Sequence, residues 1–149
     1  MERELSWNDL TVGREFTTRT RTITETDVVQ FAGSTWDTSP MHVDHEFAHR
    51  SSFGRPIAHG LLVLSYAHGL MFGSELLGRN AIAFMGVADW RFRAPVGFGD
   101  TIHVEFSVSE RRPRRSVPGQ GLVTFDVRVV DQNGVVVQSG HKTLLLHTD

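Results

Sequence analysis

Hydrophobic and polar side chains alternate along most of the second half of the chain. Val123, Phe125 and Val127, for example, alternate with polar neighbours, and this period of two is typical of a strand with one buried face. Glycine-containing turn sequences separate such segments and favour hairpin connections. The pattern predicts four antiparallel strands. They cover residues 81–93, 102–110, 122–130 and 135–147.

A long apolar segment precedes these strands. Residues 58–78 are apolar on nearly every side over about four turns, and a helix of that kind is buried. Residues 15–23 are rich in β-branched side chains and predict one further strand. The sequence therefore predicts an α+β fold in which an antiparallel sheet wraps one long helix. Such a sheet has edge strands to protect, so we expect two copies to pair edge to edge as a homodimer.

The region between the first strand and the apolar helix contains shorter elements. Thr24 is followed three positions later by Asp27, which is typical of the N-cap of a helix, and this helix should end near Gly33. Residues 34–56 are irregular because prolines and glycines interrupt them. Within that stretch, only a short helix with Asp44 as its N-cap is predicted.

Composition and charge fit one ordinary soluble domain spanning residues 1–149. The net charge of −2 gives no indication of a nucleic acid or another polyanion as partner. The absence of cysteine excludes disulfides, thiolate metal sites and a cysteine nucleophile, and it fits a cytoplasmic location. The N-terminus does not resemble a secretory signal, and no apolar stretch reaches the ~20 residues of a membrane helix.

Histidines and acids gather in residues 36–49, where His45, Glu46 and His49 satisfy the H-E-x-x-H pattern of zinc peptidases. That chemistry needs both imidazoles on one helical face and a third ligand elsewhere. Here the predicted helix has only about two turns, and charged residues flank both histidines. We interpret the segment as an exposed polar helix and expect no metal.

Asp37 and His42 are a second candidate in the same region. They are five positions apart across a loop that contains Pro40, so no regular helix places them on one face, but the loop can fold them together. A carboxylate and an imidazole that share one water form an acid/base pair active near neutral pH. The alternative is structural: Asp37 caps the loop and His42 lies on the surface.

Three motifs occur in order along nearly the whole chain: DTSPMHVD at 37–44, FGRPIAHGLL at 53–62 and FRAPVGFGDT at 92–101. Together they closely resemble the MaoC-like (R)-specific enoyl-CoA hydratases of the hotdog superfamily. The hydratase signature of that family runs Asp, any residue, Asn, Pro, any residue, His. Asp37, Pro40 and His42 agree with it, whereas Ser39 stands where asparagine is usual.

The resemblance implies an enzyme, a hydro-lyase, that interconverts trans-2-enoyl-CoA and (R)-3-hydroxyacyl-CoA. Asp37 and His42 would hold the reacting water, with either residue as the base. The backbone N–H of Gly60, at the start of the buried helix, would stabilise negative charge on the thioester oxygen. No cofactor is implied beyond the coenzyme A thioester substrate. Candidates for substrate binding are Trp36, Ser39, His59, Leu61, His68, Arg91 and Arg93.

Several assignments stay open. Trp36 either lines an acyl pocket or packs against the protein, and the His59-Gly60 pair is alternatively only a helix start. His68 either lies near the pocket and steers Asp37 or is a core histidine satisfied by a backbone carbonyl. The arginine run at 111–115, predicted at a hairpin tip without interleaved aromatics, is a solvated loop or a contact for coenzyme A phosphates rather than a nucleic-acid site.

Two other functions compete with hydration. A hotdog acyl-CoA thioesterase shares the fold and ligand, but such enzymes commonly use a carboxylate from the central helix, and here that helix offers only Glu75 near its far end. A non-catalytic acyl-CoA-binding protein is the second alternative. It is favoured if the side chains of Asp37 and His42 point apart.

Overall fold

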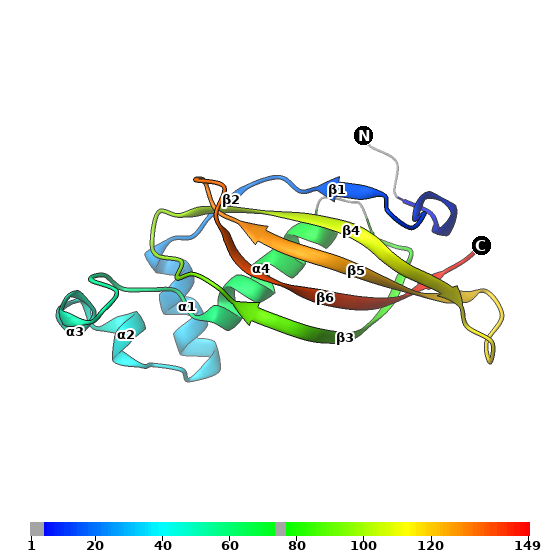
Figure 1. The fold of residues 1–149 in the computed structure, drawn as a ribbon. Coiled ribbons are helices and arrows are strands. Elements are labelled where there is room, and N and C mark those ends of the chain that lie inside the picture. Colours follow the sequence, from blue (N-terminus) through cyan, green and yellow to red (C-terminus); the bar gives the residue numbers. More distant parts are fainter. Residues whose placement is uncertain (1–4, 74–76) are drawn as a thin grey trace.

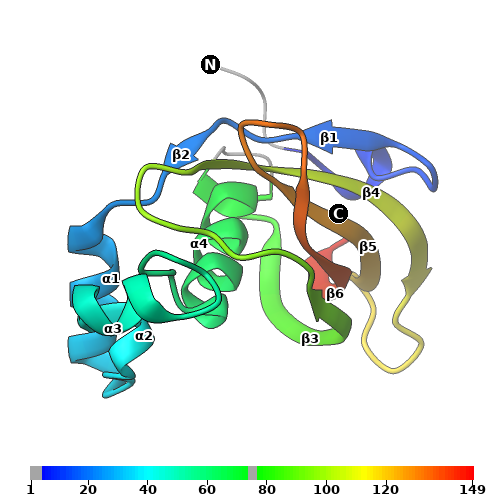
Figure 2. The ribbon, with the colours of Figure 1, turned by 60° about the vertical axis from the view of Figure 1, so that its left-hand side comes forward.

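A computed structural model of the chain describes residues 5–73 and 77–149. One antiparallel six-stranded sheet, in the order β1-β4-β5-β6-β3 with β2 also paired to β4, curves over helix α4 (Figures 1 and 2). The strands are β1 (Glu15–Thr17), β2 (Arg21–Thr22), β3 (Ala81–Phe92), β4 (Thr101–Pro113), β5 (Gln120–Val130) and β6 (Val136–His147). The helices are a 3-10 turn (Trp7–Asp9), α1 (Glu25–Thr35), α2 (Pro40–Val43), α3 (His45–Arg50) and α4 (Gly60–Gly73).

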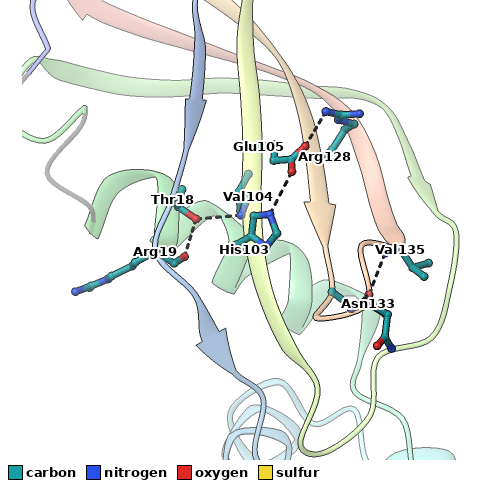
Figure 3. A network of polar contacts seen from close by, with 9 residues as sticks. Thr18, Arg19, His103, Val104, Glu105, Arg128, Asn133 and Val135 are labelled. Atoms are coloured by element: carbon teal, nitrogen blue, oxygen red, sulfur yellow. Dashed lines mark hydrogen bonds and ion pairs between the residues drawn. The ribbon is translucent and has the colours of Figure 1, made fainter.

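The predicted helix-and-sheet arrangement is confirmed, and the alternation of side chains explains it. In β4, Ile102, Val104, Phe106 and Val108 are buried and belong to one core cluster with the buried face of α4. The intervening side chains of β4 point to the other face, where His103 and Glu105 form a polar row with Arg128 of β5 (Figure 3). All four predicted long strands are present.

The first predicted strand is wrong as a single element, because it is divided into β1 and β2 at Thr18. The backbone N–H of Thr18 donates to Val104 O, but the N–H of Val104 is accepted at 3.0 Å by the Thr18 hydroxyl instead of a carbonyl. That hydroxyl donates in turn to Arg19 O at 2.8 Å (Figure 3). A side chain thus replaces a backbone group and interrupts the regular ladder.

The predicted caps of the short helices are confirmed. Thr24 and Asp27 form a capping box, in which each side chain accepts from the backbone N–H of the other. Asp44 accepts from Phe47 N–H at the start of α3. Helix α1 continues past Gly33 to residue 35, and α2 was not predicted. The α2 helix starts with Pro40, whose fixed φ and missing N–H suit a first helical position.

Helix α4 begins at Gly60 as predicted, and the sheet covers one of its faces. Leu62, Val63, Ala67, Leu70 and Met71 are buried beneath the sheet, whereas the side chain of Leu61 is 60% exposed. The predicted helix extended to residue 78, and α4 ends at Gly73; Glu75 lies outside the described residues. Among residues 5–73 and 77–149, no helix has the length and hydropathy needed to cross a membrane.

Helices α1, α2 and α3 gather at one end of the sheet, beside the first turn of α4 (Figures 1 and 2). The β4–β5 hairpin lies at the opposite end (Figure 1). This arrangement brings the loop that contains Asp37 next to Gly60.

Candidate active site

The segment between α1 and α4 brings Asp37 and His42 together. A carboxylate oxygen of Asp37, a ring nitrogen of His42 and a ring nitrogen of His59 all lie within 4.8 Å of one another. Two hydrogen bonds of about 2.8 Å let one water join atoms up to about 5.6 Å apart. Asp37 and His42 can therefore share a single water, which is the proximity that the sequence predicted.

The end of α1 directs Asp37 into this position. Trp36 adopts a left-handed conformation with φ of 66°, which turns the chain out of the helix. Asp37 N–H then donates to the hydroxyl of Thr35 at 3.3 Å, and the Asp37 carboxylate accepts from Ser39 N–H at 3.4 Å. Ser39 thus contributes its backbone to the loop, and its side chain makes no capping bond to α2.

One hydrogen bond defines the tautomer of His42. Its Nδ1 lies 2.6 Å from the backbone oxygen of Ile57, and a carbonyl oxygen can only accept, so Nδ1 carries the hydrogen. In the neutral ring the lone pair is then on Nε2. His42 is half-buried and Asp37 is exposed, so both can contact a bound water or substrate.

His59 lies beneath this pair and contacts both members. Its side chain is 2% exposed; its Nε2–H donates to the backbone oxygen of Asp37 at 2.8 Å, and its ring stacks on that of His42 with centroids 3.8 Å apart. Its Nδ1 is buried and has no hydrogen-bond partner among the described residues. Such orphaned acceptors are rare in folded proteins, so this nitrogen can accept from a bound water. The sequence predicted His59 as a substrate contact and did not predict that it holds Asp37 and His42 in place.

A cavity of about 500 Å³ lies beside Gly60. It is lined mostly by apolar side chains, among them Ile57, Leu61 and Phe92. A Cβ on Gly60 would lie 2.7 Å from the Phe92 ring, so only glycine fits without displacing that ring. As the first residue of α4, Gly60 has a backbone N–H with no partner inside the helix. Its carbonyl oxygen accepts from Gln138 Nε2 at 3.0 Å, which fixes this turn.

The other predicted substrate contacts divide into two groups. Leu61 and Arg93 line the cavity, and Arg93 is anchored by a 2.6 Å bond to the Ser139 hydroxyl. Trp36 is 89% exposed, and neither it nor Arg91 is among the described residues that line the cavity. His68 lies further along α4, and its contacts are with side chains of β6, β3 and α4 rather than with Asp37.

The H-E-x-x-H segment forms α3, and its histidines do not converge. His45 Nε2 lies 2.6 Å from a carboxylate oxygen of Glu25 in α1, and the rings of His45 and His49 meet edge to face at 6.3 Å. Within the described residues, the group of side chains close enough to hold a metal ion is that of Asp37, His42 and His59 instead. That no metal takes part stays a prediction, which metal analysis of the purified protein tests.

The arginine run lies at the far end of the sheet. Arg111 donates to the backbone oxygen of Trp7 at 2.6 Å and its guanidinium lies over the Trp7 ring, while Arg114 donates to the Gln120 side chain at 2.9 Å. In one chain this hairpin is remote from the loop that carries Asp37 (Figure 1). Arg111 therefore fastens the N-terminal 3-10 turn to the sheet.

Comparison with known proteins identifies the family. Residues 8–131 match the model of the MaoC-like domain. The chain belongs to the MaoC-like dehydratase family. This confirms the resemblance that the three sequence motifs indicated.

Relatives of this MaoC-like chain indicate both chemistry and fold. It is 39% identical over 116 residues to the 3-hydroxybutyryl-CoA dehydratase of Methylorubrum extorquens, covering 76% of this chain and 69% of that protein. It is 32% identical over 126 residues to the (R)-specific enoyl-CoA hydratase of Rhodospirillum rubrum, with coverage of 85% and 81%. These relatives support hydratase or dehydratase activity.

Solved structures of similar proteins share the fold of this chain. The MaoC-like dehydratase from Rhodospirillum rubrum superposes with a TM-score of 0.86 at 29% identity, covering 96% of this chain and 97% of that one. A Mycobacterium tuberculosis protein described as a double hotdog fold gives a TM-score of 0.87 at 20% identity, covering 98% of this chain and 45% of that one. The latter likeness shows the fold alone, and it confirms the predicted hotdog architecture.

Proposed function

We propose that this MaoC-like protein interconverts trans-2-enoyl-CoA and (R)-3-hydroxyacyl-CoA by adding or removing water. The observation that carries the proposal is the approach of an Asp37 carboxylate oxygen and a His42 ring nitrogen to within 4.8 Å, beside an apolar cavity. Relatives named for this chemistry support the same reaction.

The water is held by two acceptors. The Asp37 carboxylate accepts a hydrogen bond from one O–H of this water. The lone pair on Nε2 of His42, whose ring hydrogen is on Nδ1, accepts a hydrogen bond from the other O–H. In hydration, one of the two residues removes a proton as the water oxygen bonds to C3, and the pair returns a proton to C2. Dehydration is the reverse. Either residue can be the base in this scheme, and the pair is regenerated in each turnover.

Charge that develops on the thioester oxygen needs a donor. The backbone N–H of Gly60, with the positive end of the α4 dipole behind it, supplies that donor in our proposal. Glycine lets the thioester approach the backbone closely. The bond from Gln138 to the Gly60 carbonyl keeps the turn in place as charge builds.

His59 acts on the reaction through Asp37 and His42. It holds the backbone of the first by a hydrogen bond and the ring of the second by stacking. We assign it as a positioning residue.

The active unit in this proposal is a homodimer. Strand β3 is an edge of the sheet, and it exposes large apolar side chains. An unpaired apolar edge of this length is an aggregation hazard unless another strand covers it. A second copy that pairs through its own β3 covers the β3 edge of both copies. A stable monomer by light scattering at micromolar concentration would refute this. The exposed apolar residues of β3 are Ile82, Phe84, Met85, Val87 and Phe92.

Product analysis with crotonyl-CoA tests the reaction. Hydration removes the absorbance of the conjugated enoyl group without releasing thiol, and chiral analysis should identify the (R)-3-hydroxy product. Release of free coenzyme A would instead indicate a thioesterase. Binding of the thioester without any turnover would indicate a non-catalytic acyl-CoA-binding protein.

A further inference from the structure

The chain contains a single lysine, Lys142, and it is buried. Its side chain is 1% exposed and lies on the inner face of β6, between Phe125 of β5 and Val87 of β3 in the sheet register. None of the ion pairs within residues 5–73 and 77–149 includes it. A buried ammonium without a carboxylate is costly, so its presence calls for a reason.

The surroundings of Lys142 are aromatic and weakly polar. Its Nζ lies 3.4 Å from Nδ1 of His68, 3.9 Å from the sulfur of Met71 and 5.2 Å from the centroid of the Trp90 ring. An ammonium group can only donate, so Nδ1 of His68 accepts and the hydrogen of neutral His68 is on Nε2. Lys142 thus turns His68 into a donor whose N–H is polarised by the charge behind it.

The pKa values of Lys142 and His68 favour a charged lysine beside a neutral histidine at neutral pH. Burial lowers the pKa of Lys142 to about 8, so the amine is mainly charged at pH 7. Burial, followed by repulsion from Lys142, lowers the pKa of His68 to about 4, so this imidazole is neutral. The pair therefore carries one positive charge and one outward N–H.

The ring of His68 lies between aromatic side chains of α4 and β3. The imidazole is half-buried on the side of α4 that faces β3, between Phe72 and Phe84 with ring centroids at 4.6 and 4.5 Å. Phe84 is 47% exposed in one chain and belongs to β3, the edge strand through which the proposed homodimer pairs. No hydrogen bond of Nε2 is found within the described residues, so this N–H is available to an acceptor on a ligand.

His68 and the proposed reaction centre lie along one seam between α4 and β3. His68 is eight positions after Gly60, which is about 12 Å along a helix. Phe92 of β3 meets Gly60 at one end, and Phe84 meets His68 at the other.

A row of polar contacts links the two ends of this seam. Gln138 donates to Gly60 O and accepts from Trp90 Nε1 at 3.0 Å, and the Trp90 ring lies against Lys142. An acyl chain whose thioester lies at Gly60 and which follows α4 would reach His68.

We propose that His68, backed by Lys142, binds a carboxylate at the far end of the acyl chain, so that the preferred substrates are enoyl thioesters that end in a carboxylate. The inference rests on the proposed function and narrows its substrate class. A methyl-terminated chain would leave the His68 N–H without an acceptor and the buried ammonium without a counter-charge. A carboxylate supplies both an acceptor and the missing negative charge.

Paired substrates test this specificity. We would measure kcat/KM for enoyl-CoA thioesters of matched length, from four carbons upward, ending either in methyl or in carboxylate. At one or more lengths the carboxylate form should be preferred by at least about tenfold, the size expected when a site built to bind a polar group meets an analogue that lacks it. Lys142→Met should abolish that preference. Thr143→Val is the matched control, because Thr143 is the next residue of β6 and bonds to Thr124 on the other face.

A binding measurement keeps this inference separate from catalysis. Lysine labelled with ¹³C at Cε gives a single side-chain resonance in this chain, because Lys142 is the only lysine. Its pKa should rise from about 8 when a saturated acyl-CoA ending in carboxylate binds, and it should not move with the methyl-terminated analogue.

The outcomes separate the two proposals. Equal or better use of methyl-terminated substrates at every length, with an unresponsive Lys142 resonance, would overturn the carboxylate site and leave hydration intact. A responsive resonance without hydration of any thioester would refute the proposed function and support the carboxylate site.

Discussion

Around the first turn of α4, His42 and His59 each donate a ring N–H to a backbone carbonyl; in the middle of the same helix, His68 accepts from the ammonium group of Lys142. The first two imidazoles keep a lone pair for a ligand, and the third keeps an N–H. The partner bound at one ring nitrogen thus decides what the other nitrogen offers. In our proposals, one kind of side chain serves as a water acceptor in one region and as a donor to the ligand in the other.

The two regions also differ in how they are built. Asp37 and His42 lie on an irregular segment with two short helices, and backbone carbonyls and a stacked ring hold them. His68 and Lys142 project from a long helix and a long strand, which are fixed by the core. We therefore expect substitutions in the first region to affect turnover and substitutions in the second to affect stability and specificity.

The largest expected effect is in the first region. Asp37→Asn and His42→Gln should each lower turnover of crotonyl-CoA by about 10²- to 10⁴-fold, because each removes an acid/base group from the water. Circular dichroism and thermal melting should show an intact fold. The matched control is His45→Gln, which alters an exposed histidine of the same segment that pairs with Glu25. Full activity in either site variant would refute the pair.

The second effect concerns Lys142 and depends on pH. Its pKa is about 8 in the folded protein against 10.5 ordinarily, so the unfolded chain binds more protons between these values and stability rises with pH there. Relative to Lys142→Met, the wild type should gain about 3 kcal/mol in unfolding free energy from pH 8 to pH 10.5. Urea denaturation across this range measures the difference. A flat difference would mean that Lys142 is not buried as a charged group.

Local sequence rules account for most of the fold, since alternation in residues 102–108 and the apolar segment from Gly60 predict β4 and α4 directly. They fail where a side chain replaces a backbone partner. Thr18 divides the first strand through its hydroxyl, which no β-propensity can indicate. Helix α2 was missed because Pro40 was interpreted as an interruption and not as a first helical residue.

The sequence predicted that Asp37 and His42 lie close together, but it did not predict the side chains that hold them in place. Asp37, His42 and Gly60 belong to the family motifs. The role of His59, in contrast, depends on the stacking of its ring on that of His42, which lies in a distant segment of the chain. Lys142 lies in a segment with the pattern of an ordinary strand, and whether its side chain faces the core is decided by register. The available signal was its uniqueness, because every other basic residue apart from histidine is arginine.

A third effect sharpens the distinction between residues that touch the water and residues that hold them. His59→Phe keeps an aromatic ring under His42 but removes the donor to Asp37 O, so kcat should fall about tenfold through misplacement of the carboxylate. KM should stay the same, because the substrate cavity is unaltered. Phe31→Leu, which alters the other ring against His59, is the control and should change kcat less. A rise in KM alone would make His59 a substrate contact.

The smallest expected effect tests whether the first region depends on the helix that leads into it. Thr24→Ala removes the hydroxyl that caps α1 and should lower the unfolding free energy by about 1 kcal/mol. Thr24→Ser keeps the hydroxyl and should lose much less. Both variants should retain kcat/KM, because Asp37 and His42 are held by His59 and Ile57 and not by the first turn of α1. A loss of activity in Thr24→Ala at unchanged stability would show instead that the capping box positions the catalytic loop.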